Sequence, residues 1–169
     1  MRFFDSASFE AVKRNHAVEH ATVSMLLGQL QKKTRIVGRA SRDGFYIYGD
    51  LTSEQIEQSA REGLARMKHG ESHLAVSPLC GTNIVVTAIL TGLASALAIG
   101  GSGNRFVRLP NVMAMALLAV VAARPVGALV QRYLTTSPEV DDLEIAAVRP
   151  MRFPGLHKVT ISRSWSSPP

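Results

Sequence analysis

The chain has 169 residues, a formal net charge of +6 and one cysteine, Cys80. This length suits one domain of moderate size, and a single cysteine excludes an intrachain disulfide. The positive charge favours an anionic partner such as a membrane surface or a nucleic acid. The first nine residues, MRFFDSASF, contain Asp5 and lack an apolar core, so no signal peptide is expected there.

The first expected element is a long helix over residues 8–31, which contains no proline and no glycine before Gly28. Within it His16, Glu19 and His20 read HAVEH, the H-x-x-E-H pattern of zinc hydrolases. On a helix the two histidines share one face, and Glu19 lies beside them, where it would take a proton from metal-bound water. An apolar repeat that begins at Phe9 places His16 and Glu19 on the buried side, where polar groups are costly unless paired or bound to metal.

The next segments predict a β-hairpin and a second helix. Two extended runs, 36–41 and 45–48, flank a turn at 42–44, and Thr52 with Gln55 forms a possible capping box for a helix that ends at Gly70. Residues 72–76 are expected to form a third strand. Basic residues cluster around the hairpin: Lys32, Lys33, Arg35, Arg39 and Arg42. A lipid headgroup is the favoured anion for this cluster, with nucleic acid not expected and a solvated basic face as the plain alternative.

The middle of the chain predicts a transmembrane hairpin. Residues 84–100 are apolar or small throughout, and residues 109–131 contain one charge, Arg124, beside Pro125, where the second span is expected to break. Arg124 either snorkels to the membrane interface or pairs with a carboxylate of the aqueous domain. Further strands are expected over 143–148 and 158–162.

These elements give an α+β aqueous domain interrupted by a two-helix transmembrane hairpin. Residues 1–80 form the α+β part, 81–131 the hairpin, 132–163 C-terminal strands that return to the first part, and 164–169 a disordered tail. We expect a multi-pass protein of a bacterial inner membrane. Its termini are expected in the cytoplasm, because basic residues next to the spans outnumber those in the connecting turn.

The whole chain resembles a family of small bacterial two-span membrane proteins of unknown function. The resemblance rests on Asn15-His16 with residues 19–22, on residues 44–50, on Cys80-Gly81-Thr82-Asn83, and on the two spans with Thr135-Thr136. Residues 16–68 also look like a shortened pitrilysin-type zinc peptidase. That likeness implies that His16, His20 and a downstream glutamate bind zinc and that Glu19 is the general base.

A zinc site needs a third protein ligand. Glu71 is the best positional match to the downstream glutamate, with His69 and His73 beside it, and Cys80 is the chemical alternative because a thiolate completes a two-His, one-Cys site. The hypothesis is therefore a membrane-anchored zinc-dependent hydrolase, most plausibly a metallopeptidase acting on a protein or peptide. The alternatives are a non-catalytic assembly factor or complex subunit in which the HxxEH cluster is structural, and a metal-binding sensor.

Overall fold

A computed structural model describes residues 6–30, 35–100 and 105–164. The chain divides into two compact units: the first comprises Met1–Ser77 with Leu134–Pro169, and the second comprises Pro78–Tyr133. The fold is a mixed helix and sheet domain with two long apolar helices inserted into it, which confirms the predicted fold class.

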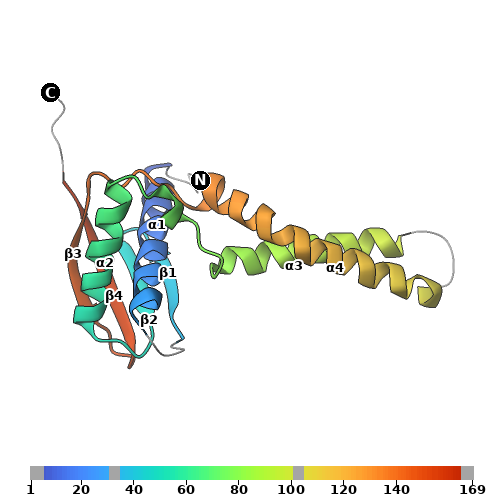
Figure 1. The fold of residues 1–169 in the computed structure, drawn as a ribbon, viewed down its shortest axis with the longest axis horizontal. Coiled ribbons are helices and arrows are strands. Elements are labelled where there is room, and N and C mark those ends of the chain that lie inside the picture. Colours follow the sequence, from blue (N-terminus) through green and yellow to red (C-terminus); the bar gives the residue numbers. More distant parts are fainter. Residues whose placement is uncertain (1–5, 31–34, 101–104, 165–169) are drawn as a thin grey trace, which may run out of the picture. The chain divides into compact units, whose positions relative to one another are not determined.

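The first unit is a four-stranded antiparallel sheet with two helices on one face (Figure 1). The strand order is β1-β2-β4-β3, so β1 and β3 are the sheet edges. The elements of this unit are α1 (Ser6–Gln29), β1 (Val37–Ser41), β2 (Gly44–Tyr48), α2 (Ser53–Lys68), a 3₁₀ turn η1 (Ser72–Ala75), β3 (Leu143–Pro150) and β4 (Leu156–Arg163).

Helix α1 is the central element of the core. Sheet residues such as Phe45 and Ile47 lie in one hydrophobic cluster with Val18 and Leu26 of α1. Because α1 also packs against α2 and η1, its middle is covered on several sides rather than along one stripe. The expected apolar repeat is therefore wrong at its beginning, where Phe9 is 49% exposed.

The predicted β-hairpin and the capping box are confirmed. Thr52 Oγ1 accepts a hydrogen bond from the Gln55 backbone N–H, and the Thr52 N–H donates to Gln55 Oε1 at 2.9 Å. The expected strand over 72–76 is wrong, because residues 72–75 form the turn η1. Two i→i+3 bonds, from Leu74 N–H and Val76 N–H, satisfy this backbone locally.

The two C-terminal strands are also confirmed, and both are longer than expected. The preceding residues run beside α1, where the Ser137 N–H donates to the Lys13 carbonyl and Arg14 pairs with Asp142. The disordered tail predicted over 164–169 stays a prediction, and at its first residue the Ser164 N–H donates to the Asp142 carbonyl at 2.8 Å. The rest of the expected tail and Lys32 and Lys33 of the basic cluster lie outside the described residues.

The second unit contains α3 (Gly81–Ile99) and α4 (Arg105–Val130), which pack along each other. A π-helical turn, η2 (Gln131–Thr135), follows α4 directly in the chain, and Gln131 donates a hydrogen bond to Asn83 Oδ1 at 2.9 Å. The expected break at Pro125 is wrong, since α4 continues from Arg105 to Val130 with both Pro110 and Pro125 inside it.

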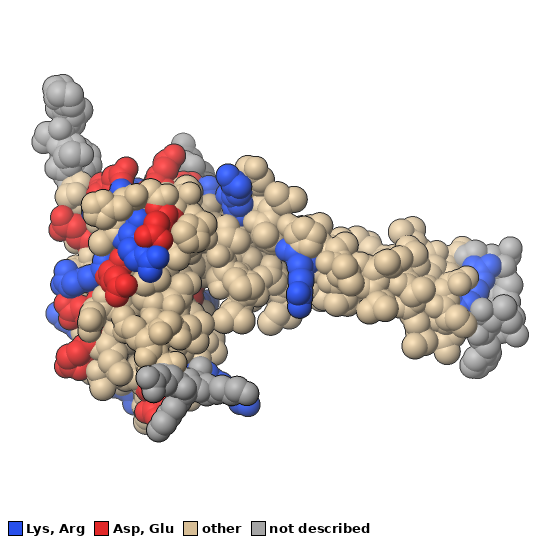
Figure 2. Space-filling view, viewed as in Figure 1, with Lys and Arg blue, Asp and Glu red and all other residues tan. Residues whose placement is uncertain are grey.

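Both helices are long and apolar enough to cross a membrane. Their outer surfaces carry many exposed aliphatic side chains, such as Leu97 at 78% and Leu117 at 66% exposure. In Figure 2 the helical pair is tan over nearly all of the face in view, whereas the first unit shows both basic and acidic side chains.

Candidate metal centre

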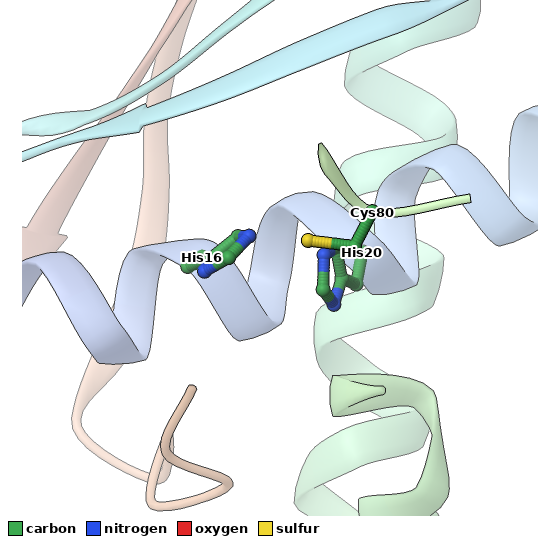
Figure 3. A group of neighbouring side chains, drawn as sticks. All are labelled: His16, His20 and Cys80. Atoms are coloured by element: carbon green, nitrogen blue, oxygen red, sulfur yellow. The ribbon is translucent and has the colours of Figure 1, made fainter. Parts of the chain in front are cut away.

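The HAVEH residues lie near the middle of α1, as predicted. His16 and His20 are one helical turn apart, and their ring centroids are 4.3 Å apart with the ring planes at 59° (Figure 3). Burial differs along the turn, because His20 is 3% exposed while the His16 side chain is 17% exposed. The pair therefore has one deeply buried imidazole and one near the edge of the core.

Backbone carbonyls fix the orientation of both imidazoles. His16 Nδ1 lies 2.8 Å from the Thr135 carbonyl oxygen, and His20 Nδ1 lies 2.7 Å from the Ala75 carbonyl oxygen. A carbonyl oxygen can only accept, so each Nδ1 donates its proton to a carbonyl, and in a neutral ring of this tautomer Nε2 carries the lone pair. Metal-bound histidines commonly have this arrangement, with the second ring nitrogen held by a carbonyl or a carboxylate.

The Nε2 atom of His20 is buried and has no hydrogen-bond partner among the described residues. A buried nitrogen without a partner costs about 1–3 kcal/mol relative to a satisfied one. Asn15 Oδ1 is the other buried polar side-chain atom of α1 without a partner in the described part of the chain, and of the two only the imidazole nitrogen is a usual zinc ligand.

Glu19 lies between the two histidines on the same helix. Its residue is 6% exposed, and its Oε2 is 3.7 Å from His16 Nε2. The carboxylate occupies the space above Gly38 of β1, where a Cβ atom would overlap it. No pattern of residues indicated this contact, since a glycine in a short edge strand has several ordinary explanations.

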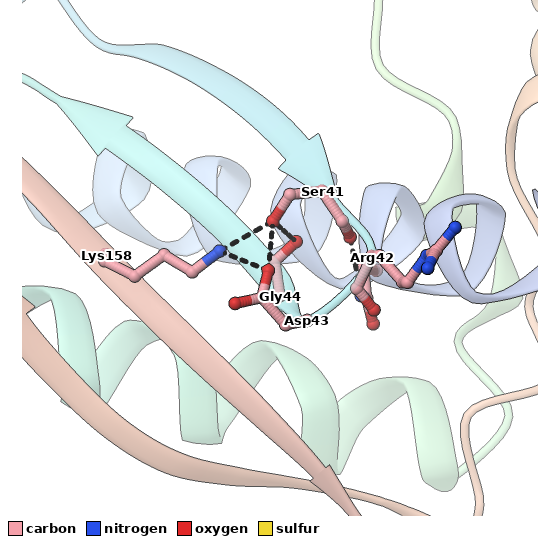
Figure 4. A network of polar contacts seen from close by, with 6 residues as sticks. Ser41, Arg42, Asp43, Gly44 and Lys158 are labelled. Atoms are coloured by element: carbon pink, nitrogen blue, oxygen red, sulfur yellow. Dashed lines mark hydrogen bonds and ion pairs between the residues drawn. The ribbon is translucent and has the colours of Figure 1, made fainter. Parts of the chain in front are cut away.

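Asn15 directly precedes the motif, and the sequence pattern used it only for the family resemblance and gave it no structural role. It is 1% exposed, and its side-chain amide donates to the carbonyls of Ser41 and Arg42 at 2.8 and 3.1 Å. It thereby holds the β1–β2 turn against α1. The same turn receives the Lys158 ammonium, which donates to Ser41 Oγ and Asp43 Oδ1 (Figure 4).

Glu71, the first candidate for the third ligand, binds an arginine. Arg66 Nε lies 2.8 Å from its Oε1 and Arg66 Nη2 lies 2.6 Å from its Oε2, so both carboxylate oxygens accept hydrogen bonds. This hydrogen-bonded pairing holds the pKa of Glu71 below its ordinary value. No group of three metal-ligand side chains among the described residues joins Glu71 to His16 and His20.

Cys80, the other candidate, begins the second unit. It caps the N-terminus of α3, where its Sγ accepts a hydrogen bond from the Thr82 N–H at 3.4 Å, and its thiol is not part of a disulfide. Figure 3 labels it together with the two histidines of α1. Cys80 is only five residues beyond Ala75, whose carbonyl holds His20.

Comparison with known proteins connects the chain to an uncharacterised protein of Picosynechococcus sp. strain PCC 7002. The two are 29% identical over 135 residues, which cover 75% of this chain and 66% of the relative, slightly less than two thirds of its length. No solved structure matches the chain. A family model, the Domain of unknown function (DUF6391), matches residues 11–148. This match includes the HAVEH residues, β1, β2, both apolar helices and most of β3, and the chain therefore belongs to this family of unknown function.

Proposed function

We propose that His16, His20 and Cys80 hold one zinc ion and that Glu19 is the general base of a membrane-anchored hydrolase. The observation that carries the proposal is the state of the imidazoles. Both donate Nδ1–H to backbone carbonyls, and the buried Nε2 of His20 has no partner among the described residues. Two neutral imidazoles and a thiolate form a donor set that zinc prefers.

The structural alternative needs a closed network in which every buried polar atom is satisfied. His20 argues against it, because the ring nitrogen that faces away from Ala75 stays unsatisfied within the described part of the chain. A bound metal ion removes this cost, since it uses the lone pair that no donor occupies.

Donor chemistry favours Cys80 as the third ligand, because a thiolate completes a two-His, one-Cys site of the kind that zinc prefers. Chain connectivity does not separate the two candidates, since Glu71 is four residues before Ala75 and Cys80 is five residues after it. Glu71 is the second choice, because a carboxylate that binds zinc would have to give up hydrogen bonds to Arg66.

Zinc would supply a polarising charge and a bound water of lowered pKa. Glu19 would accept the proton from that water, and the space at Gly38 keeps its carboxylate on the histidine side of β1. The pitrilysin-type resemblance of the motif helix supports a peptide bond as the substrate. The two apolar helices support attachment to the inner membrane, with the termini in the cytoplasm.

The test compares the wild-type chain with Glu19→Gln in detergent, using a library of fluorogenic peptides and measuring zinc on the same samples. Glu19→Gln should keep its zinc and lose roughly 10²–10⁴-fold in kcat, because an amide cannot accept the proton. If the wild-type chain binds zinc but hydrolyses none of the peptides, the hydrolase proposal is rejected and a metal-binding protein remains. Cys80→Ser and Glu71→Gln identify the third ligand by which of them weakens zinc binding.

A further inference from the structure

One end of the sheet exposes a group of large apolar side chains. Exposure is 72% for Phe153, 61% for Val37, 54% for Tyr48 and 43% for Met151, and Leu156 beside them is partly buried. We call these five residues the sheet-end patch. Scattered exposed apolar residues are ordinary, whereas a contiguous group marks an interaction surface.

The strand register places the members of the patch together. Val37 of β1 is opposite Tyr48 of β2, and Tyr48 is opposite Leu156 of β4. The β3–β4 turn, which contains Met151 and Phe153, is attached to the same end of the sheet. The Met151 N–H donates to the Leu156 carbonyl at 2.8 Å.

A pair of glycines joins this turn to the end of β2. The Gly49 N–H donates to the Gly155 carbonyl at 2.9 Å, and Gly155 has a φ of +77°, which side-chain-bearing residues rarely adopt. A Cβ at Gly155 would lie 3.0 Å from the Gly49 carbonyl oxygen. The close contact of the turn with Tyr48 is therefore built into the backbone.

The patch is bordered by positive charge. This end of the sheet is formed by the described segments 35–39, 48–50 and 149–156. They contain one carboxylate, that of Asp50, and four exposed arginines: Arg35, Arg39, Arg149 and Arg152. A shallow pocket of about 300 Å³ lies on the same face, lined by Val37, Arg39, Tyr46, Tyr48 and Leu156. Apolar side chains surrounded by guanidinium groups are complementary to a surface that offers both hydrocarbon and phosphate.

We propose that the sheet-end patch binds the surface of an anionic lipid bilayer, as a second membrane contact besides the two apolar helices. Phe153, Met151 and Val37 would insert at the boundary between headgroups and acyl chains, and the arginines would bind lipid phosphates. A nucleic acid fits less well, because three of the five patch residues, Val37, Met151 and Leu156, are not aromatic and cannot stack on unpaired bases. This proposal does not depend on the zinc site.

The experiment uses the full chain in nanodiscs with lipids brominated in the acyl chain, which quench nearby tryptophan fluorescence. The natural Trp165 is replaced in Trp165→Phe, and Phe153→Trp then places a single reporter in the patch. The control reporter is Ser162→Trp, at an exposed position near the other end of β4. Phosphatidylcholine discs are compared with discs that also contain phosphatidylserine.

We expect the emission at position 153 to shift to the blue and to lose intensity in anionic discs, more than at position 162. Arg149→Glu with Arg152→Glu, or high salt, should reverse both changes. Equal quenching at the two positions, or no effect of phosphatidylserine, overturns the proposal. A response of position 153 to added oligonucleotides instead of lipid would assign the patch to nucleic acid, and protection by dimerisation in detergent would assign it to a second copy.

Discussion

At the scale of single residues, Gly38 limits where the Glu19 carboxylate can lie. A methyl group at Gly38 would occupy the position of that carboxylate, so Gly38→Ala should displace it while His16 and His20 stay in place. We expect zinc binding to be retained and peptide hydrolysis to fall in parallel with Glu19→Gln. The measurement is kcat together with the zinc content of each variant.

Gly28→Ala is the matched control for this substitution. Gly28 is exposed on α1, and a Cβ there meets no atom within 4 Å. This variant should stabilise the helix by about 0.5–1 kcal/mol and leave hydrolysis unchanged. If Gly38→Ala behaves like Gly28→Ala, the carboxylate is not held in the position described.

At the scale of elements, the two segments that connect the units hold the two imidazoles. Ala75 precedes the end of the first unit at Ser77, and Thr135 follows its return at Leu134. We expect both rings of the metal-free chain to be Nδ1–H tautomers, which nitrogen-15 NMR of labelled histidine distinguishes by chemical shift. A dominant Nε2–H tautomer at either position would show that the carbonyl contact is absent.

The β1–β2 turn should make folding sensitive to acid. The hydrogen bond from Lys158, followed by that from Ser41, lowers the pKa of Asp43. A carboxyl group with a lowered folded pKa stabilises the protein above its unfolded value of about 3.9, and this contribution is lost as the pH falls through the folded value.

The expected result is a thermal midpoint that falls below about pH 4 less steeply in Asp43→Asn than in wild type. Glu71 beside Arg66 and Glu10 beside Lys13 have lowered pKa values as well, so the variant should reduce the acid sensitivity without abolishing it. Identical pH profiles for the two chains would contradict the role of the Lys158–Asp43 pair.

Local patterns were sufficient to predict most elements, but contacts between distant segments were not. The capping box at Thr52 and the hairpin around Gly44 depend on neighbouring residues and were confirmed. The 3₁₀ turn at 72–75 was missed because its conformation depends on packing against α1, and Phe9 was misplaced because burial of α1 depends on α2 and the sheet. The acceptors Ala75 and Thr135 act through backbone carbonyls, which no residue type reveals.

At the scale of the whole molecule, the exposed aliphatic surface of α3 and α4 should require an amphiphile. We expect the full chain to aggregate in water and to become monodisperse in detergent or lipid, because exposure of so much apolar surface to water is unfavourable. Size-exclusion chromatography with light scattering measures this. A monodisperse species without detergent would mean that the two helices are covered by protein.

Orientation is a separate expectation at the same scale. The number of basic residues differs between the two ends of the spans. Four are next to the ends that lead to the termini, Arg66, Lys68, Arg124 and Arg132, and two are near the connection of the helices, Arg105 and Arg108. This bias predicts that the termini lie in the cytoplasm. A C-terminal phosphatase fusion that is active only in the periplasm would reverse the assignment.

The metal content of the purified chain tests the central claim most directly. Elemental analysis of the full-length protein, purified in detergent without chelators, should find one zinc ion per chain, with the loss of this metal in both His16→Ala and His20→Ala. The two variants should still fold, as judged by circular dichroism. A folded wild-type chain that carries no metal, and takes up none from added zinc, would contradict the account and leave the HAVEH cluster as a structural element of α1.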